Sequence, residues 1–222
     1  MTRPNKEKAG NVTAGYFDSY ANEFDSIYGS WKGLPHRLVN RYLRGSVRER
    51  FKLTLEACSP VEGKTVLDVG CGPGHYSVGL AMLGAKEVTG IDFAPGMVEL
   101  ARAKAAEKHL QEVCKFEVRD FFSVTGSSYN YLILMGFMDY IADAEACVRH
   151  SMGLFKEKAF FSFPVSGGFL AWQRKLRYRR KCPLYLYSYA DVVRIFTAIP
   201  GIRFRIRNLK RDYWVEAWHD VM

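Results

Sequence analysis

The sequence predicts a doubly wound α/β domain organised around a mostly parallel sheet. From Thr65 onward, short apolar segments alternate with helical segments, which is the order of successive βαβ units. One segment, YLILM at 131–135, is an unbroken apolar run, as expected of a parallel strand that is covered on both faces. The chain has 222 residues, 48% of them hydrophobic, which suits one domain of ordinary globular composition.

The first 58 residues favour helices instead. Residues 1–15 are a polar tail, and 16–28 (YFDSYANEFDSIY) carry aromatic side chains at helical spacing. Residues 38–58 favour one or two further helices that end before Ser59-Pro60. We therefore expect a tail and helical region over 1–58 and the main domain over 59–222.

Five strands are expected in the first part of the main domain, with helices between most of them. The strands are 65–69, 87–91, 115–118, 131–136 and 159–163, and the helices are 75–83, 95–109 and 143–154. Gly84 ends the first of these helices and Pro95 begins the second, the positions at which glycine and proline are favoured.

The pattern changes after Pro164. Residues 165–188 are basic and aromatic and form an insertion, and a helix over 189–199 ends at Pro200-Gly201. Residues 202–209 alternate apolar and basic side chains, as a half-exposed strand does, and 213–219 form a last strand. The short connection allows these two strands to pair as an antiparallel hairpin.

The net charge of +9 is concentrated in one part of the chain. Residues 173–211 contain twelve Lys or Arg and one acid, a charge of +11, and the other residues sum to −2. This predicts a local electropositive surface. No apolar run reaches the roughly 18 residues of a membrane span, and residues 1–10 do not resemble a secretory signal.

The five cysteines are widely spaced and contain no CxxC pair, so neither a disulfide framework nor a zinc site is indicated. The expected compartment is the reducing cytoplasm.

The sharpest local signal is VLDVGCGPGHYS at 66–77, a glycine-rich loop between a strand and a helix. Its glycines permit close approach of a ligand to bare backbone, and the amides at the start of the helix favour an anionic group. A dinucleotide fingerprint requires a glycine where this chain has His75, which disfavours a nicotinamide enzyme. Cys71 lies within the loop, where a small buried residue is the favoured interpretation.

Two acids follow neighbouring strands. Asp92 ends the second strand, where a carboxylate can accept hydrogen bonds from a ribose diol; the alternative is a helix cap ahead of Pro95. Asp120 follows the third strand, with Phe121 beside it, where it can reach an adenine amino group; the alternative is an ordinary loop acid.

With these elements in order, residues from about Thr65 to His219 resemble the class I S-adenosylmethionine-dependent methyltransferases. The matching elements are DVGCGPG at 68–74, GIDFAPGM at 90–97, VRDFF at 118–122 and LILMGFMDYI at 132–141. The resemblance is closest to bacterial members with a GxxDYI element after the fourth strand and a CPxYxY element before the last helix. It implies a seven-stranded sheet with an antiparallel last strand, and an N-terminal helical lid.

The resemblance also implies roles for individual residues. Asp68 would help to hold the amino group of S-adenosylmethionine, Asp92 would bind the ribose, and Asp120 would meet the adenine. A carboxylate that only stabilises the turn is the alternative for Asp68. The expected cofactor-binding residues are Asp68, Gly70, Cys71, Gly72, Asp92, Phe93, Met97, Asp120, Phe121 and Gly136. The product would be S-adenosylhomocysteine.

Methyl transfer from a sulfonium needs little catalytic machinery, because the methyl group is already activated. The protein has to bring a nucleophile into line, and a general base is needed only where the nucleophile arrives protonated. Asp139 and Tyr140 are the candidate catalytic residues, with His36 and the N-terminal tyrosines as further candidates; a helix cap and a packed aromatic are the structural alternatives for the first two. No metal is expected, since no ligand cluster is evident.

The expected acceptor is a small or lipid-like molecule, with an anionic one favoured by the basic insertion at 165–188. Arg179 and Arg180 would contact it, and Tyr16, Tyr20 and Tyr28 would belong to the lid, unless the aromatic run packs as core. The basic segment is alternatively a solvated face, a peripheral membrane contact or a nucleic-acid patch. An RNA methyltransferase and a non-catalytic cofactor-binding partner protein are therefore the competing functions. The absence of a D/N-P-P-Y/F element after the fourth strand counts against nucleobase N-methylation.

Overall fold

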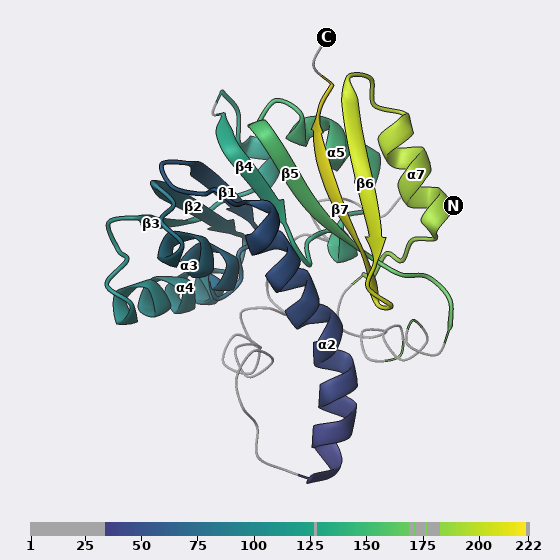
Figure 1. Ribbon diagram of the computed structural model, residues 1–222, viewed down its shortest axis with the longest axis horizontal. Coiled ribbons are helices and arrows are strands. Elements are labelled where there is room, and N and C mark those ends of the chain that lie inside the picture. The colour runs from purple at the N-terminus through teal and green to yellow at the C-terminus, as the bar shows by residue number, and fades with distance from the viewer. Residues whose placement is uncertain (1–33, 127, 169–170, 172–175, 177–182, 221–222) are drawn as a thin grey trace.

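A computed structural model describes residues 34–126, 128–168, 171, 176 and 183–220, with side chains described from Gly45 onward. Seven strands form one sheet in the order β3-β2-β1-β4-β5-β7-β6 (Figure 1). β7 pairs antiparallel with both β5 and β6, and the pairs among β1 to β5 are parallel. The strands are β1 Thr65–Val69, β2 Glu87–Asp92, β3 Cys114–Val118, β4 Tyr129–Leu134, β5 Phe155–Pro164, β6 Ile202–Asn208 and β7 Asp212–His219.

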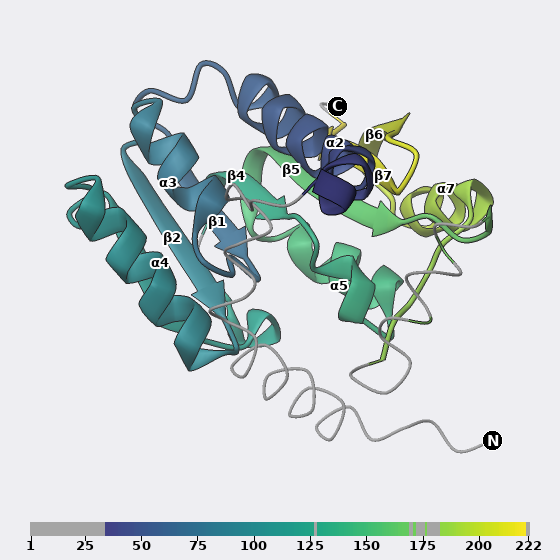
Figure 2. The same ribbon diagram turned by 90° about the horizontal axis from the view of Figure 1, so that it is seen from below.

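Helices cover both faces of the sheet. Figure 2 shows α2, α3 and α4 on one face and α5 and α7 on the other. α2 packs only part of its length on the sheet and extends past the strand ends (Figure 1). The helices are α2 Leu34–Ala57, α3 His75–Met82, α4 Pro95–Glu107, α5 Ala144–Ser151 and α7 Tyr189–Thr197, with 3-10 turns η2 Phe121–Ser123 and η3 Met138–Tyr140.

The predicted doubly wound fold is confirmed, with differences at element ends. Residues 34–57 form a single helix, which is one of the two alternatives predicted for this region, and it begins four residues earlier than expected. β5 begins at Phe155, four residues earlier than the apolar segment 159–163 indicated, because the polar residues 156–158 separate Phe155 from that segment. The predicted hairpin of the last two strands is confirmed, and β7 is the antiparallel strand of the sheet.

The core has one apolar layer on each face of the sheet. The layer toward α5 and α7 includes Phe161, Phe163 and Phe196, all fully buried. The layer toward α2, α3 and α4 includes Phe160 and Trp214. Alternate residues of β5 thus serve opposite layers, as expected of a strand covered on both sides.

A polar network holds together the amino ends of β1, β4 and β5. The Asn130 side-chain oxygen accepts from the Thr65 backbone N–H at 2.9 Å, and its Nδ2 donates to Glu157 at 2.7 Å. Glu157 also pairs with Lys64 at 2.6 Å. Burial alone would raise the pKa of Glu157, but its hydrogen bonds with Lys64 and Asn130 hold that pKa below the usual range.

Replacing Asn130 by Asp is expected to lower the free energy of unfolding by about 1–2 kcal/mol at pH 7, since a donor to Glu157 becomes a second carboxylate. Urea unfolding measures the change. In a Glu157→Gln background the penalty should largely disappear, because the amide introduced at position 157 can donate to the new carboxylate. Equal penalties in both backgrounds would contradict the role assigned to this contact.

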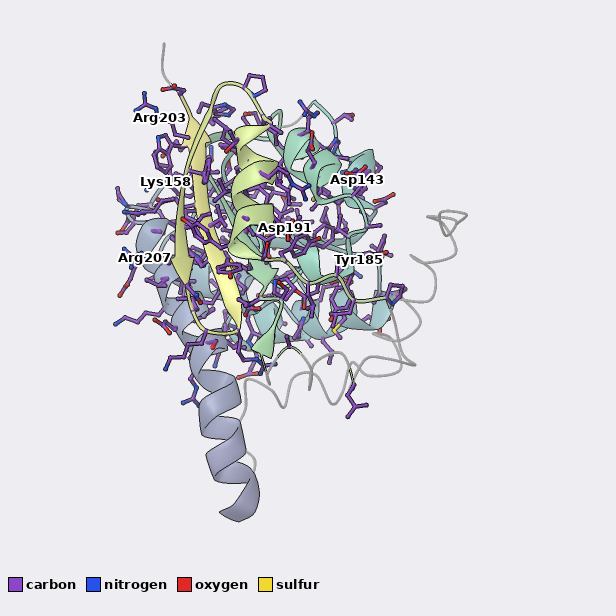
Figure 3. The ribbon with its side chains drawn as sticks, turned by 90° about the vertical axis from the view of Figure 1, so that its right-hand side faces the viewer. Asp143, Lys158, Tyr185, Asp191, Arg203 and Arg207 are labelled. Carbon is purple, nitrogen blue, oxygen red and sulfur yellow. The ribbon has the colours of Figure 1, made fainter. Side chains whose placement is uncertain are left out.

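β6 is an edge strand that carries a row of exposed arginines, Arg203, Arg205 and Arg207. Figure 3 shows Lys158, Arg203 and Arg207 along one side of the molecule. Glu216 is buried and pairs with both Lys158 and Arg205, and the Arg207 guanidinium lies 6.0 Å from the centre of the Trp214 ring. Part of the positive charge of residues 173–211 therefore covers the sheet face beside α2.

Candidate functional site

The loops that follow β1, β2, β3 and β4 meet at the carboxyl edge of the parallel strands. β1 lies between β2 and β4 in the sheet. The chain adds β2 and β3 on one side of β1 and then crosses to add β4 and β5 on the other side, so the strand order reverses at β1. Such a switch point is where open α/β sheets bind ligands. The four loops carry the glycine loop, Asp92, Asp120 and the turn at 136–141, so the structure brings these predicted elements to one edge.

The glycine loop is closely covered by an aromatic ring. Gly70 has a φ of 62°, and a Cβ there would lie 2.8 Å from the Phe137 ring, so no side chain fits. Cys71 is buried, and its backbone N–H donates to the Ile91 carbonyl at 3.0 Å, which ties the loop to β2. At the end of the loop Gly74 is the N-cap of α3, without a side-chain cap.

Asp92 connects two of the loops. Its Oδ2 accepts from the Gly72 backbone N–H at 2.9 Å, and its Oδ1 accepts from the Ala94 N–H at 3.0 Å. The N-cap of α4 is Ala94, without a side-chain cap, so Asp92 does not fill the alternative capping role. A carboxylate offers about four acceptor positions, two on each oxygen, and this one is only partly buried. A carboxylate at this place in an open α/β sheet is the kind of group that accepts from ribose hydroxyls.

Asp68 lies beneath the glycine loop. It is nearly fully buried, and its Oδ2 accepts from the backbone N–H of Ser77 at 3.1 Å and from the Ser77 hydroxyl at 2.6 Å. Burial raises the pKa of the Asp68 carboxyl to about 7, although the Ser77 hydrogen bonds oppose this. The two contacts with Ser77 fit the alternative in which Asp68 stabilises the turn. The Asp68 carboxyl changes its charge near neutral pH.

Because the folded pKa of Asp68 lies above its unfolded value, the contribution of this group to stability should fall as pH rises from about 4 to about 7 and stay constant above that. Asp68→Asn removes the titrating group and keeps an oxygen for Ser77. Denaturant unfolding of both proteins at pH 5 and pH 8 measures the effect. We expect Asp68→Asn to gain stability relative to the wild type at pH 8, whereas parallel pH profiles would contradict an elevated pKa.

The residues expected near an adenine lie around η2. Asp120 is the exposed N-cap of η2 and accepts from the Phe122 N–H at 3.0 Å. Phe93 is 39% exposed at the end of β2, whereas Met97 is 1% exposed and packs with Ala94. Phe93 therefore offers an open apolar face, and Met97 supports the loop from below.

The η2 turn is held from behind by aromatic contacts. Phe121 is buried, and its ring lies 4.9 Å from His150 and 5.7 Å from Phe137, centre to centre. His150 Nε2 lies 3.2 Å from the Phe121 carbonyl oxygen. Phe121 thus links the turn after β3 to the turn after β4 and acts as a packing residue of the site.

The turn after β4 is joined to the end of the insertion. The Tyr185 N–H donates to the Asp139 carbonyl at 2.8 Å, and the Tyr187 hydroxyl reaches the Met138 and Ile141 carbonyls at 3.4 and 3.2 Å. Burial raises the pKa of Tyr187, so the hydroxyl stays a donor. The Asp139 side chain is 2% exposed and Tyr140 is half-buried. The GxxDYI segment and residues 183–187 of the CPxYxY segment are therefore neighbours.

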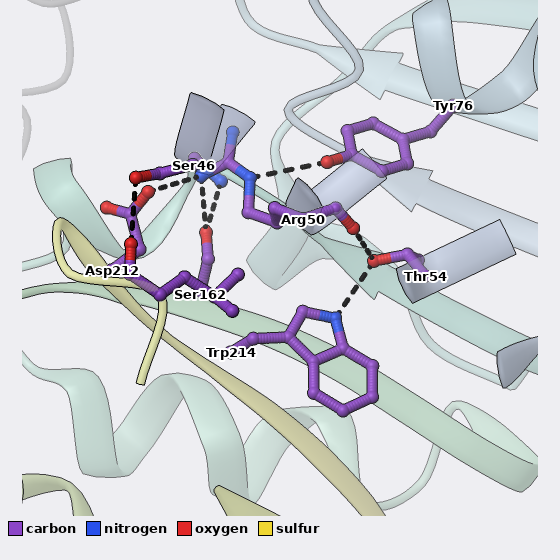
Figure 4. Close-up of polar contacts among 9 residues, drawn as sticks. Ser46, Arg50, Thr54, Tyr76, Ser162, Asp212 and Trp214 are labelled. Atoms are coloured by element: carbon purple, nitrogen blue, oxygen red, sulfur yellow. Dashed lines mark hydrogen bonds and ion pairs between the residues drawn. The ribbon is translucent and has the colours of Figure 1, made fainter. Parts of the chain in front are cut away.

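A buried cation also reaches this turn, and the sequence did not single it out. Arg50 of α2 is 6% exposed; its Nη1 lies 3.0 Å from Ser162 Oγ and 3.4 Å from Asp212 Oδ2, and its Nε lies 3.3 Å from the Tyr76 hydroxyl (Figure 4). A Cβ placed on Gly136 would lie 3.6 Å from Nη2. Arg50 therefore brings positive charge to the carboxyl edge of β4.

Several predicted residues lie outside the described residues: Tyr16, Tyr20, Tyr28, Arg179 and Arg180; the side chain of His36 is outside them too. Within the described part of the chain, no group of three or more His, Cys, Asp or Glu is arranged to hold a metal ion. Of the helices described there, none is long and apolar enough to cross a membrane.

The chain is similar to known methyltransferases in sequence and in fold. Residues 60–166 match the family model described as "Methyltransferase domain". Among solved structures, magnesium protoporphyrin IX methyltransferase from Synechocystis PCC 6803 with bound SAH superposes with a TM-score of 0.77 at 23% identity, over 96% of this chain and all of that one. The fold is that of the class I methyltransferases.

Curated relatives cover the same region. Ubiquinone biosynthesis O-methyltransferase from Methylobacterium nodulans is 29% identical over 62% of this chain and 59% of its own length. The protein of that name from Cereibacter sphaeroides (strain ATCC 17029) is 30% identical over 63% of this chain and 57% of its own length. This chain thus matches somewhat more than half the length of these relatives.

Proposed function

We propose that this protein transfers a methyl group from S-adenosylmethionine to a small-molecule acceptor. The observation that carries the proposal is Asp92, a partly buried carboxylate at the sheet's switch point, whose two oxygens accept from the backbone N–H groups of Gly72 and Ala94. The methyltransferase-domain match and the names of the relatives support it.

The proposal gives each part of S-adenosylmethionine a partner at this edge of the sheet. Asp92 would accept from the ribose hydroxyls, and Asp120 and Phe93 would meet the adenine. Bare backbone at Gly70 and Gly72 would allow the methionine part to approach. Arg50 would attract its carboxylate, because a buried guanidinium lies beside Gly136, and ionised Asp68 would act on its amino group.

The bound sulfonium supplies an activated methyl group and a neutral thioether leaving group. In the proposed transfer, the bond from the methyl carbon to the acceptor atom would form as the carbon–sulfur bond breaks, and a proton on the acceptor would pass to a base. Tyr140 and Asp139 are the proposed base candidates. Tyr140 is the better placed to touch an acceptor, because it is only half-buried whereas Asp139 is in the interior.

The acceptor is proposed to be small or lipid-like, and the two ubiquinone relatives favour oxygen as the methylated atom. The insertion at 165–188 would contribute to its pocket, since residues 183–187 contact the turn at 136–141. The same proposal includes three further points. The acceptor is anionic and is contacted by Arg179 and Arg180. A lid contains Tyr16, Tyr20 and Tyr28, and the protein is located in the cytoplasm or at the membrane periphery. Membership of the subgroup with GxxDYI and CPxYxY elements is also part of the proposal.

The test is transfer of labelled methyl from S-adenosylmethionine into an extract of the source cells, later divided into lipid, small-molecule, protein and RNA fractions. The controls are Asp92→Ala and Asp220→Ala; Asp220 is a surface acid that pairs with Arg203. Label in the lipid or small-molecule fraction that is lost only with Asp92→Ala would support the proposal. Label in RNA, or cofactor binding without label anywhere, would replace it with an RNA methyltransferase or a binding protein.

A further inference from the structure

Ser162 is a lone hydroxyl within the aromatic strand β5. It lies between Phe161 and Phe163, and all three side chains are fully buried. Burying a hydroxyl is unfavourable unless it is hydrogen-bonded. The Ser162 Oγ accepts from the Gly136 backbone N–H at 2.7 Å and from Arg50 Nη1 at 3.0 Å. One oxygen therefore joins the turn after β4 to the cation of α2.

Both contacts use the acceptor capacity of the same atom. A serine hydroxyl has two lone pairs, and the Gly136 N–H and the Arg50 guanidinium engage them from different elements. The position of the Gly136 turn and the position of the guanidinium are thus set relative to one another. The same Nη1 also lies 3.4 Å from Asp212 Oδ2, and Figure 4 shows Ser162 and Asp212 together beside Arg50.

The Gly136 contact also fixes a carbonyl. Across a trans peptide the C=O points opposite to the N–H, so an amide held by Ser162 turns the Met135 carbonyl away from Ser162. Gly136 has a φ of 76°, a left-handed conformation that glycine adopts readily, so the bond to Ser162 selects one of several accessible orientations of this peptide. Loss of the hydroxyl would free this peptide to rotate.

We infer that Ser162 is a positioning residue for methyl transfer. It acts through Gly136 and Arg50: its hydroxyl holds the backbone at Gly136, an expected cofactor contact, in register with the guanidinium proposed to bind the carboxylate of the cofactor. This inference rests on the proposed function. A positioning role differs from a packing role in one measurable way: removing the Ser162 hydroxyl should lower turnover more than it lowers the affinity for the cofactor.

The test compares Ser162→Ala with Ser151→Ala, a matched control. Ser151 is also a fully buried serine, but it lies on α5, on the opposite face of the sheet, and its hydroxyl donates to the Cys147 carbonyl at 2.9 Å. Three quantities are measured: the Kd of S-adenosylhomocysteine, methyl transfer at saturating S-adenosylmethionine into the small-molecule extract fraction, and hydrogen exchange at the Gly136 amide.

For Ser162→Ala we expect transfer to fall about 100-fold, as for a misplacement of about 1 Å. The S-adenosylhomocysteine Kd should rise less than tenfold, because Arg50 keeps its contacts with Asp212 and Tyr76. Exchange at Gly136 should accelerate, and Ser151→Ala should change neither turnover nor this exchange. If Ser162→Ala does not fold, Ser162→Cys takes its place, since a thiol is a weak acceptor of similar size.

Turnover of Ser162→Ala within threefold of wild type would overturn the inference while leaving the proposed function intact. A fall in affinity as large as the fall in turnover would also overturn it, because Ser162 would then serve binding alone. Absence of both cofactor binding and label in the wild type would instead refute the proposed function, and the inference with it.

Discussion

Replacing Asp92 by alanine should weaken the binding of S-adenosylhomocysteine by about 100-fold or more. With the carboxylate removed, the ribose of the ligand would lose two charge-assisted hydrogen bonds, each worth about 1.5–3 kcal/mol. The same change removes the acceptor of the Gly72 and Ala94 N–H groups, so the glycine loop also loses an anchor. Isothermal titration calorimetry at pH 7 measures the Kd.

Two control variants bracket this result. Asp220→Ala removes an acid that pairs with Arg203 beyond the far end of β7 and should leave the Kd unchanged. Asp120→Ala should weaken binding less than tenfold, because that carboxylate is exposed and its contribution is screened by water. A Kd for Asp92→Ala within threefold of wild type would exclude the ribose role of this residue.

Replacing Arg50 by methionine should produce the largest loss of stability among the variants considered. Arg50 and Asp212 are an ion pair with side chains only 7% and 4% exposed. Removing one partner of a buried pair leaves an uncompensated charge, which costs about 3–5 kcal/mol. Urea unfolding followed by tryptophan fluorescence measures the change, and Trp214 is a suitable probe because its Nε1 donates to Thr54 of α2 at 2.9 Å.

A double variant separates the structural role of Arg50 from its proposed binding role. Arg50→Met with Asp212→Asn neutralises both partners, and most of the lost stability should return. Binding of S-adenosylhomocysteine should remain weak in the double variant, because the cation proposed to hold its carboxylate is still absent. Recovery of both stability and affinity would show that Arg50 serves only the fold.

β1 and β4 were predictable because their segments are largely apolar and end at a glycine, and β6 was predictable because apolar and basic side chains alternate along it. The start of β5 was not, since Lys156, Glu157 and Lys158 interrupt the run. The structure explains their place: Glu157 bonds to Lys64 and Asn130 at the amino edge, and Lys158 pairs with Glu216. Polar residues at a strand end are satisfied by neighbours that a local pattern does not reveal.

The candidate site also contains residues that the sequence could predict and residues that it could not. The glycine loop, Asp92 and Asp120 follow strand ends, so their meeting at one edge follows from the parallel order. Arg50 could not be found by that reasoning, because a charged residue in a helix is ordinarily solvent-facing. Its partners Ser162 and Asp212 lie 112 and 162 residues further along the chain, and only the folded sheet brings them together.

The arginines of β6 bear on how copies of this chain behave in concentrated solution. An edge strand presents unpaired backbone groups that a second copy can join, at a spacing of about 4.8 Å. Such pairing would bring two rows of guanidinium groups together. Asp220 and Glu216 offset part of this positive charge, and repulsion between the charges that remain opposes the pairing. Screening lengths shrink from about 8 Å at physiological ionic strength to about 3 Å at 1 M salt. Light scattering should therefore detect self-association that grows with salt, so the purified protein should be kept dilute or at low ionic strength.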